Sequence, residues 1–121
     1  MQFSVPIKNN YEFRRVYNKG KSAATSRVVV YCRPYRTADK NRLGITVGTK
    51  IGKAVVRNRI RRRIKEIYRT NEEKLKSGYD IVIVARVRSG ESQYKELERD
   101  IMKLCAKLGI VKDEKDTDIS C

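Results

Sequence analysis

The stretch KAVVRNRIRRRIKEIYR, residues 53–69, carries the strongest structural signal in this chain of 121 residues. An α-helix advances by about 100° per residue, so apolar residues three and four positions apart share one face. Four apolar residues of this stretch fall within one narrow arc: Val56, Ile60, Ile64 and Ile67. The pattern predicts a long helix that docks on a sheet through this apolar stripe.

The rest of the same helix is strongly cationic. Residues 50–69 contain a single acid, Glu66, and nine cations: Lys50, Lys53, Arg57, Arg59, Arg61, Arg62, Arg63, Lys65 and Arg69. A solvated surface normally mixes both signs, and like charges four residues apart destabilise a helix by a few tenths of a kcal/mol per pair. A polyanion lying along the helix would remove that repulsion, and arginine suits bidentate contacts with phosphate. The helix is therefore predicted to bind a polyanion.

The whole chain has the same bias, with a formal net charge of +15 from 29 Lys and Arg against 14 Asp and Glu. Nucleic acid and an anionic membrane surface are the two candidate partners. No run approaches the roughly 18 apolar residues of a membrane span, and the first ten residues lack the apolar stretch of a signal peptide. We therefore expect a cytoplasmic protein with one domain over residues 1–111 and a disordered, acidic tail over residues 112–121.

The remaining hydrophobic pattern predicts two further helices and three strands. The first helix is expected to be capped by Asn10 and ended by Gly20. The third strand is apolar on both faces, so it should lie centrally in the sheet and be covered on both sides. The predicted helices are Tyr11 to Asn18 and Ser92 to Leu108, and the strands are Arg27 to Tyr35, Arg42 to Gly48 and Tyr79 to Arg86.

The first two strands each show one face that does not belong to the core. Val29, Tyr31 and Arg33 alternate with the core residues of the first strand and mix apolar, aromatic and cationic side chains. Such a surface can stack bases and neutralise phosphates. On the second strand Gly44 and Gly48 share the non-core face, which leaves room for something to lie close to the backbone.

The sequence offers no convincing active site of its own. There is no histidine, the usual general base near neutral pH, and the acids are scattered. Cys32 and Cys105 are expected in the core and Cys121 at the surface, and none forms a zinc-ligand pair. The stretch from Gly48 to Ala54 fails as a phosphate-binding loop, because it has one residue too few between its glycines and an alanine after the lysine. We expect no catalytic and no metal-binding residues.

At this point the residues resemble a known family. The run from Lys50 to Arg62, with Arg57-Asn58-Arg59 at its centre, resembles the signature of the bacterial ribonuclease P protein subunit. The resemblance covers roughly residues 9–108, including the Phe13, Tyr17 and Gly20 spacing, Leu43-Gly44 and Tyr79-Asp80-Ile81-Val82.

The resemblance implies a fold and a function. The fold would be a single α/β (α+β) two-layer sandwich, with a four-stranded sheet, about three helices and a left-handed β-α-β crossover. The chain would bind a large catalytic RNA, and the complex would remove the 5′ leader from precursor tRNA as an endoribonuclease. Hydrolysis would be performed by the RNA with its bound Mg²⁺, so no cofactor is expected on the protein.

The resemblance also implies two sets of contact residues. Six residues around the basic helix would contact the catalytic RNA, and its cationic surface adds Arg61: Lys50, Lys53, Arg57, Asn58, Arg59, Arg61 and Arg62. A cleft between the first helix and the sheet would hold the single-stranded leader, and the mixed face of the first strand adds Arg33: Phe13, Tyr17, Val29, Tyr31 and Arg33. Phe13 could equally pack in the core, and Tyr17 has the same alternative.

Two other functions remain open on the residues alone. A structural RNA-binding protein of the ribosome would also be small, basic and α/β. A nuclease that acts without RNA is the second alternative, against which stand the missing histidine and the lack of clustered carboxylates.

Overall fold

The computed structural model describes residues 4–7, 9–34 and 40–112. Predicted helices and strands agree with the observed ones to within about two residues at each end. The elements follow in this order: β1 (Ser4–Pro6), α1 (Asn10–Lys19), β2 (Lys21–Ala24), β3 (Val28–Pro34), β4 (Asn41–Val47), η1 (Thr49–Ile51), α2 (Ala54–Asn71), η2 (Glu72–Lys74), β5 (Tyr79–Ala85), η3 (Val87–Glu91) and α3 (Tyr94–Lys107). Helices η1, η2 and η3 are short 3₁₀ turns that join the longer elements.

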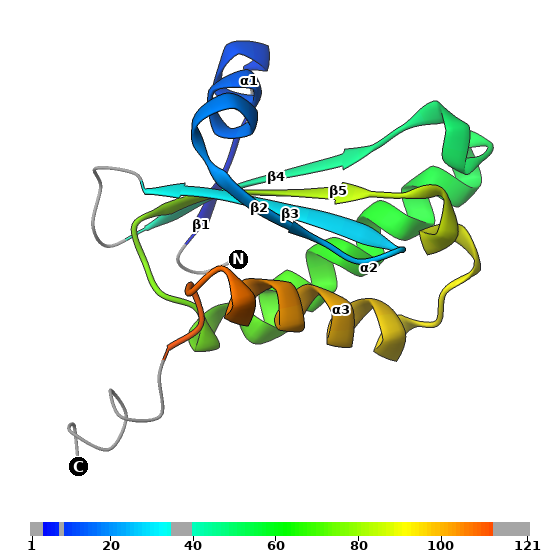
Figure 1. Cartoon of the computed structure of the whole chain (residues 1–121). Helices are drawn as coiled ribbons and strands as arrows, with labels where there is room; N and C mark the ends of the chain where they lie inside the picture. Colours follow the sequence, from blue (N-terminus) through cyan, green and yellow to red (C-terminus); the bar gives the residue numbers. More distant parts are fainter. Residues whose placement is uncertain (1–3, 8, 35–39, 113–121) are drawn as a thin grey trace.

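The strands form one mixed sheet in the order β1-β4-β5-β3-β2 (Figure 1). β4 pairs in parallel with β1 and β5, whereas β3 pairs antiparallel with β5 and β2. The expected four strands are therefore wrong, because the sheet has five. Neither edge strand has a sequence signal: β1 is three residues long and ends in a proline, and β2 reads Lys-Ser-Ala-Ala, without apolar alternation.

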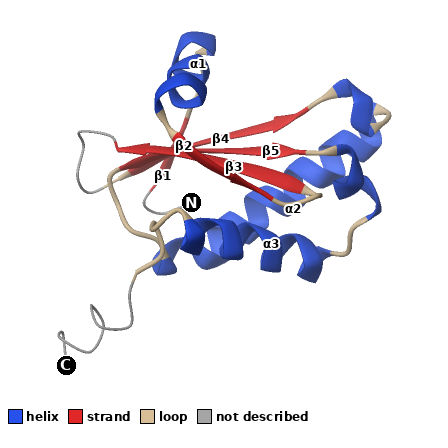
Figure 2. Cartoon of the chain, viewed as in Figure 1, coloured by secondary structure: helices blue, strands red, loops and turns tan. Residues whose placement is uncertain are grey.

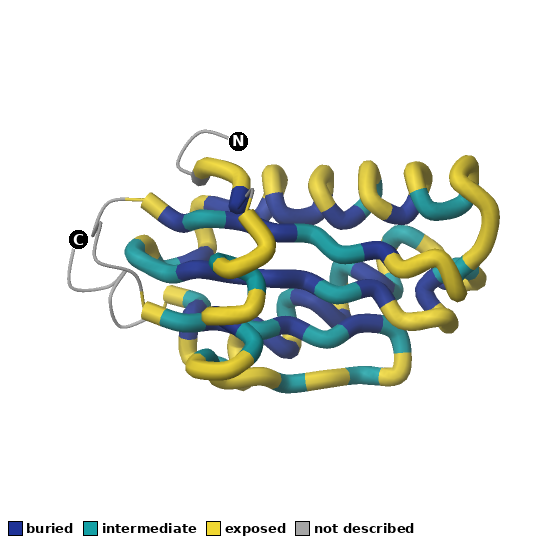
Figure 3. Tube along the Cα trace, turned by 90° about the horizontal axis from the view of Figure 1, so that it is seen from above, coloured by how far each residue is buried: buried dark blue, intermediate teal, exposed yellow. Residues whose placement is uncertain are grey.

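The helices lie on both faces of the sheet (Figures 1 and 2). α2 and α3 cover one face, and α1 lies across the other. The two-layer prediction is therefore incomplete, since three layers are present where α1 crosses the sheet. The prediction for β5 is confirmed: it is the central strand, Ile81 and Ile83 pack with α2 and α3, and Val82 packs with the α1 side. Figure 3 shows the buried middle of the sheet and the exposed outer sides of the helix turns.

β4, α2 and β5 form a β-α-β unit whose two parallel strands are neighbours in the sheet. Such connections are right-handed in nearly all proteins. The left-handed crossover that the resemblance implies stays a prediction. No helix among the described residues is both long enough and apolar enough to cross a membrane.

The ends of α1 differ in one detail from the prediction. The N-cap is Asn9 rather than Asn10, and its side-chain amide donates to Glu12 Oε1 at 2.9 Å instead of capping the backbone. Gly20 does end the helix, with an extended φ of −87°. A Cβ at Gly20 would lie 2.5 Å from the carbonyl oxygen of Val16 and 2.6 Å from that of Cys32. Glycine is required there because two backbones approach each other closely.

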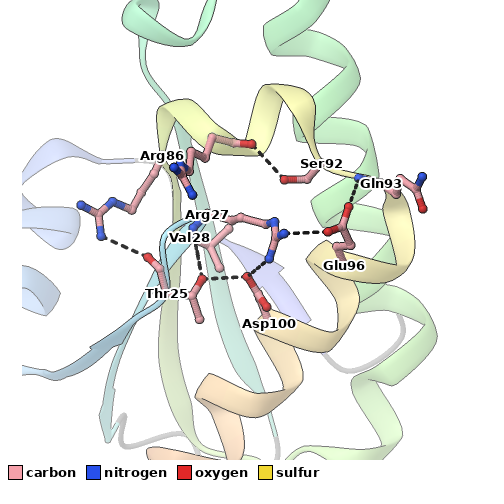
Figure 4. Close-up of polar contacts among 9 residues, drawn as sticks. Thr25, Arg27, Val28, Arg86, Ser92, Gln93, Glu96 and Asp100 are labelled. Carbon is pink, nitrogen blue, oxygen red and sulfur yellow. Dashed lines mark hydrogen bonds and ion pairs between the residues drawn. The ribbon is translucent and has the colours of Figure 1, made fainter.

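A polar network ties the turn between β2 and β3 to α3 (Figure 4). Arg27 donates to Glu96 Oε2 at 2.6 Å and to Asp100 Oδ2 at 3.2 Å, and the hydroxyl of Thr25 donates to the same Asp100 oxygen at 2.8 Å. Gln93 and Glu96 form a capping box at the start of α3. The carboxylates on this side of α3 are therefore engaged in holding the helix to the sheet.

Candidate nucleic-acid interface

The predicted apolar stripe of α2 is confirmed. Ile60, Ile64 and Ile67 are fully buried against the sheet, and Val56 is half-buried. The opposite side forms a surface that we call the α2 basic face. It consists of Lys50, Lys53, Arg57, Asn58, Arg59, Arg61, Arg62 and Lys65, all exposed except the half-buried Arg57. All seven residues predicted to contact the catalytic RNA belong to it.

The start of α2 concentrates positive charge. Gly52 joins η1 to α2 with φ of 153°, a conformation that L side chains rarely adopt, and so places Lys50 and Lys53 beside the first turn. That turn contains no acid, and the N-cap, Lys53, makes no side-chain cap. The unpaired N–H groups of a helix N-terminus carry a partial positive charge, which adds to that of the lysines. This end of the helix therefore attracts anions.

Two other cations of the basic stretch are engaged within the protein. Arg63 donates to the carbonyl oxygen of Ser92 at 3.0 Å, and Arg69 pairs with Glu66 at 2.5 Å. The hydrogen bond from Arg69 lowers the pKa of the Glu66 carboxyl. Within the described part of the chain no ion pair joins the α2 basic face to an acid. Arg57 donates through Nε to the carbonyl oxygen of Gly52 at 3.2 Å, but no charge of the face is neutralised by an acid of the described residues.

The opposite face of the sheet carries an aromatic cluster beneath α1. The ring of Tyr17 lies edge-on to that of Tyr31, with 4.8 Å between centroids, and 6.4 Å from that of Phe13. The hydroxyl of Tyr17 lies 3.2 Å from the hydroxyl of Thr46 on β4, so the two share a hydrogen bond. All three rings are half-buried, and each keeps part of its surface exposed.

Two hollows lie beside this cluster, and together with it we call them the α1 cleft. One has a volume of about 450 Å³, and its lining is Asn10, Phe13, Arg14, Tyr17 and Thr46. The other, of about 330 Å³, reaches around the edge of β4 to α2, and its lining is Pro6, Ile7, Phe13, Leu43, Gly44, Ile45, Arg61 and Lys65. Phe13 lines both hollows and also packs with the buried cluster around Val16, and its contact with a leader stays a prediction.

The other predicted cleft residues lie along β3. Val29 and Arg33 are half-buried on the same strand face as Tyr31, two residues to either side of it. Neither of them lines the two hollows, and Tyr31 does not line them either. The expected room beside Gly44 is filled by the protein itself, because a Cβ there would lie 2.5 Å from the Phe13 ring. Gly48, in contrast, has open space around it.

Three residues of the first hollow were missed by the sequence analysis: Asn10, Arg14 and Thr46. The helical spacing of Asn10, Phe13, Arg14 and Tyr17 could have identified the first two, since positions i, i+3, i+4 and i+7 share a face. Thr46 lies on the non-core face of its strand but has no aromatic or cationic group to distinguish it. Its role depends on a tertiary contact that the sequence does not display.

A charged cluster positions α1 on the sheet, and it too was missed. Arg42 on β4 donates to both carboxylate oxygens of Asp80 on the neighbouring β5, at 2.7 and 2.8 Å. The same guanidinium pairs with Glu12 of α1. The side chain of Asp80 is only 1% exposed, so this pair lies in a region where salt and water screen charges weakly. The cluster links the helix, β4 and β5.

The buried thiols are not activated. Cys32 and Cys105 are buried, as predicted, whereas Cys121 lies outside the described residues. So does the tail expected over residues 112–121, except for Lys112, whose backbone N–H donates to the carbonyl oxygen of Lys74 at 2.8 Å. Burial raises the pKa of Cys105 to about 12 and also raises that of Cys32. A thiol is nucleophilic as the thiolate, so neither group is reactive near neutral pH. Over the described ranges, no three His, Cys, Asp or Glu side chains are grouped where they could hold a metal ion.

Comparison with known proteins agrees with this geometry. The family model described as Ribonuclease P matches residues 1–109. The ribonuclease P protein component of Alkaliphilus metalliredigens is 41% identical over 111 residues, which cover 92% of this chain and 99% of the relative. The chain belongs to the ribonuclease P protein family. A family member from Clostridium botulinum (strain Langeland) is 46% identical over 105 residues, covering 86% of this chain and 94% of the relative.

Solved structures of family members share the fold. The Staphylococcus aureus RNase P protein superposes with a TM-score of 0.81 at 31% identity, covering 88% of this chain and 97% of that one. The protein from Thermotoga maritima gives 0.74 at 28% identity, covering 81% and 92%. As a family member, this chain is the protein part of an endoribonuclease that processes tRNA 5′ ends together with an RNA. The ribosomal and RNA-independent alternatives are thereby set aside.

Proposed function

We propose that this chain holds two RNAs at once. The catalytic RNA of ribonuclease P lies along the α2 basic face, and the single-stranded 5′ leader of precursor tRNA lies in the α1 cleft. The observation that carries the proposal is the presence of two exposed surfaces of different chemistry, centred on opposite faces of one sheet and meeting where Arg61 and Lys65 line the second hollow. One is cationic and the other is aromatic with cations at its rim.

The α2 basic face suits the phosphate backbone of a folded RNA. Its arginines have no acidic partner within the described ranges, so, apart from the Arg57 Nε that donates to the carbonyl oxygen of Gly52, their donors are available for phosphate oxygens. Binding would release counterions from the RNA and make the affinity fall steeply with salt. Asn58 adds a neutral donor and acceptor between two arginines, which suits contact with sugar or base edges.

The α1 cleft suits a flexible single strand. Partly exposed rings such as Tyr17 and Tyr31 can stack bases with little sequence preference, and Arg14 and Arg33 can approach the phosphates between them. Because only the precursor has a leader, binding in this cleft would favour substrate over product. The chain would thereby improve the substrate preference of the complex without acting on the reacting bond.

The chemistry itself is assigned to the RNA. Hydrolysis would use Mg²⁺ held mainly by the RNA, and neutralisation of phosphates by the α2 basic face would lower the Mg²⁺ concentration that the complex needs. We place this processing in the cytoplasm, as expected from the sequence.

The proposal is tested by reconstituting the chain with a bacterial ribonuclease P RNA. Cleavage of precursor tRNA is measured at low Mg²⁺ with the RNA alone, with the wild-type chain and with Arg59→Gln/Arg62→Gln. We expect strong stimulation by the wild type and a loss of that stimulation in the variant, for long and short leaders alike. Equal cleavage with and without the chain would refute the proposal, and cleavage by the chain alone would refute the assignment of the chemistry to the RNA.

A further inference from the structure

α3 carries a second row of cations that no function has yet been assigned to. Lys95, Arg99, Lys103 and Lys107 follow one another at intervals of four residues, and all four are exposed. We call them the α3 cation row. A step of four residues turns the helix by about 40°, so the row winds within about 120° of the helix surface. At about 1.5 Å per residue it runs about 18 Å along the helix.

The acids of α3 do not compensate this row, because each is engaged elsewhere. Glu96 and Asp100 bind Arg27, and Glu98 accepts a hydrogen bond from the Asn71 amide at 2.9 Å (Figure 4 shows the first two). For the described ranges, no ion pair involves any member of the α3 cation row. The acids of α3 therefore contact the rest of the protein, whereas the four cations of the row face solvent.

This arrangement costs the folded protein stability. Neighbours in the row repel by a few tenths of a kcal/mol per pair, and Lys95 in the first turn is also opposed by the helix dipole. Only Lys107, in the last turn, is favoured by that dipole. Folding alone therefore gives no reason for the row, whereas a polyanion would turn each of these charges into a favourable contact.

The helix that carries the row lies beside α2. α2 and α3 cover the same face of the sheet, on the side away from α1, as Figure 1 shows. They are joined side by side by the bond from Arg63 to Ser92 and by that from Asn71 to Glu98. A polyanion that lies along the outward side of α2 can therefore extend onto α3 without crossing the sheet.

We propose that the α3 cation row binds the sugar–phosphate backbone of the same catalytic RNA that lies along α2. This inference rests on the proposed function for its partner. A membrane surface fits less well, because helices that lie on membranes expose apolar residues beside their basic ones. Leu97, Ile101, Leu104 and Cys105 of α3 are all buried in the core. The row is thus suited to phosphate contacts that position the RNA and carry no sequence preference.

The test uses the full chain with three members of the row replaced, Lys95→Gln/Arg99→Gln/Lys103→Gln. Lys107 stays in place because its removal would weaken the end of the helix. The control is Lys40→Gln/Lys74→Gln/Lys112→Gln, which removes the same charge from exposed positions outside α2 and α3. The Kd for the ribonuclease P RNA is measured between 50 and 200 mM salt for the wild type and both variants.

The α3 variant should reduce the slope of log K against log salt by about 3, near one per cation. Over a fourfold change in salt, this corresponds to the wild type losing about 60-fold more affinity than the variant. The control should keep the wild-type slope, and the melting temperature of the α3 variant should equal or exceed that of the wild type, since repulsion is relieved.

Equal slopes for the α3 variant and the control would overturn the inference while leaving the proposed function intact. A wild-type chain that fails to bind the RNA at all would instead refute the proposed function. Binding of the wild type to anionic lipid vesicles of phosphatidylserine and phosphatidylcholine, abolished in the α3 variant while RNA affinity is unchanged, would assign the row to a membrane and overturn the inference as well.

Discussion

Tyr31 offers the sharpest test of the α1 cleft. It projects from β3 on the α1 side of the sheet, where its ring meets that of Tyr17 edge-on at a 71° interplanar angle. The ring is half-buried, so one part supports the cleft and another remains open to a ligand. Tyr31→Ala removes the surface on which a leader base would stack, and leaves the α2 basic face on the other side of the sheet unchanged.

The expected loss of affinity for precursor tRNA follows from the free energy of base stacking. An aromatic platform contributes roughly 1–3 kcal/mol per base, so the affinity of the holoenzyme for precursor tRNA should fall roughly 5- to 150-fold. Loss of the aromatic pair and of half the burial of a large ring should also lower the free energy of unfolding by about 2 kcal/mol. Tyr31→Phe keeps the ring and should change either quantity little.

The assay compares two substrates with the reconstituted holoenzyme. The Kd for a precursor tRNA with a leader of several nucleotides is measured beside the Kd for mature tRNA without a leader, at fixed Mg²⁺ and salt. We expect Tyr31→Ala to weaken precursor binding within the stated range and to leave mature tRNA binding and catalytic RNA affinity unchanged. Thermal melts establish that the variant remains folded under assay conditions.

Two outcomes would contradict this reasoning. Equal weakening of precursor and mature tRNA binding would mean that Tyr31 acts through the whole complex rather than through the leader. No weakening in a folded variant would mean that the leader does not touch this ring. In either case the assignment of Tyr31 to leader binding would fail, and so would that of Val29 and Arg33, which lie on the same face of β3.

Three further changes probe other parts of the structure. Gly20→Ala forces a Cβ against two backbone carbonyls and should lower the free energy of unfolding by about 1–3 kcal/mol in urea denaturation, whereas Gly48→Ala, in open space, should be nearly neutral. Asp80→Asn leaves the half-buried guanidinium of Arg42 with one anion fewer and should lower the free energy of unfolding by about 3 kcal/mol in the same urea denaturation. An unchanged urea midpoint would show that Glu12 alone is enough to stabilise the Arg42 charge. Arg62→Gln should reduce the salt slope of catalytic RNA binding by about 1, and a slope equal to the wild-type value would exclude Arg62 from the interface.

The features that could be predicted are those that the local sequence encodes repeatedly. α2 was predicted because its apolar stripe recurs over four turns and its cations occupy the other positions. The aromatic face of β3 was predicted because strict alternation along a strand separates two faces, whichever elements later cover them. In both cases many residues carry the same information, so a single exception does not change the interpretation.

The features that could not be predicted depend on how distant elements meet. Phe13, Val16 and Tyr17 indicate that α1 packs through one face, but nothing in their spacing says which side of the sheet receives it. The room left by Gly44 was interpreted as space for a ligand, yet the ring of Phe13, thirty-one positions earlier in the chain, occupies it. Edge strand β2 depends on pairing with β3 rather than on its own composition.

One strand connects the two proposed RNA sites. Along β4, Leu43 and Val47 pack with the core that supports α2, while Gly44 and Thr46 face α1 and the cleft. Side chains alternate along a strand, so a shift of one residue in the pairing of β4 would exchange these two sets and disrupt both surfaces together. Leu43 and Gly44 lie opposite Ile81 and Val82 of β5, and Arg42 is bonded to Asp80 in the same register. The buried ion pair is therefore well placed to hold that register, and with it the assignment of the β4 side chains to the two proposed RNA sites.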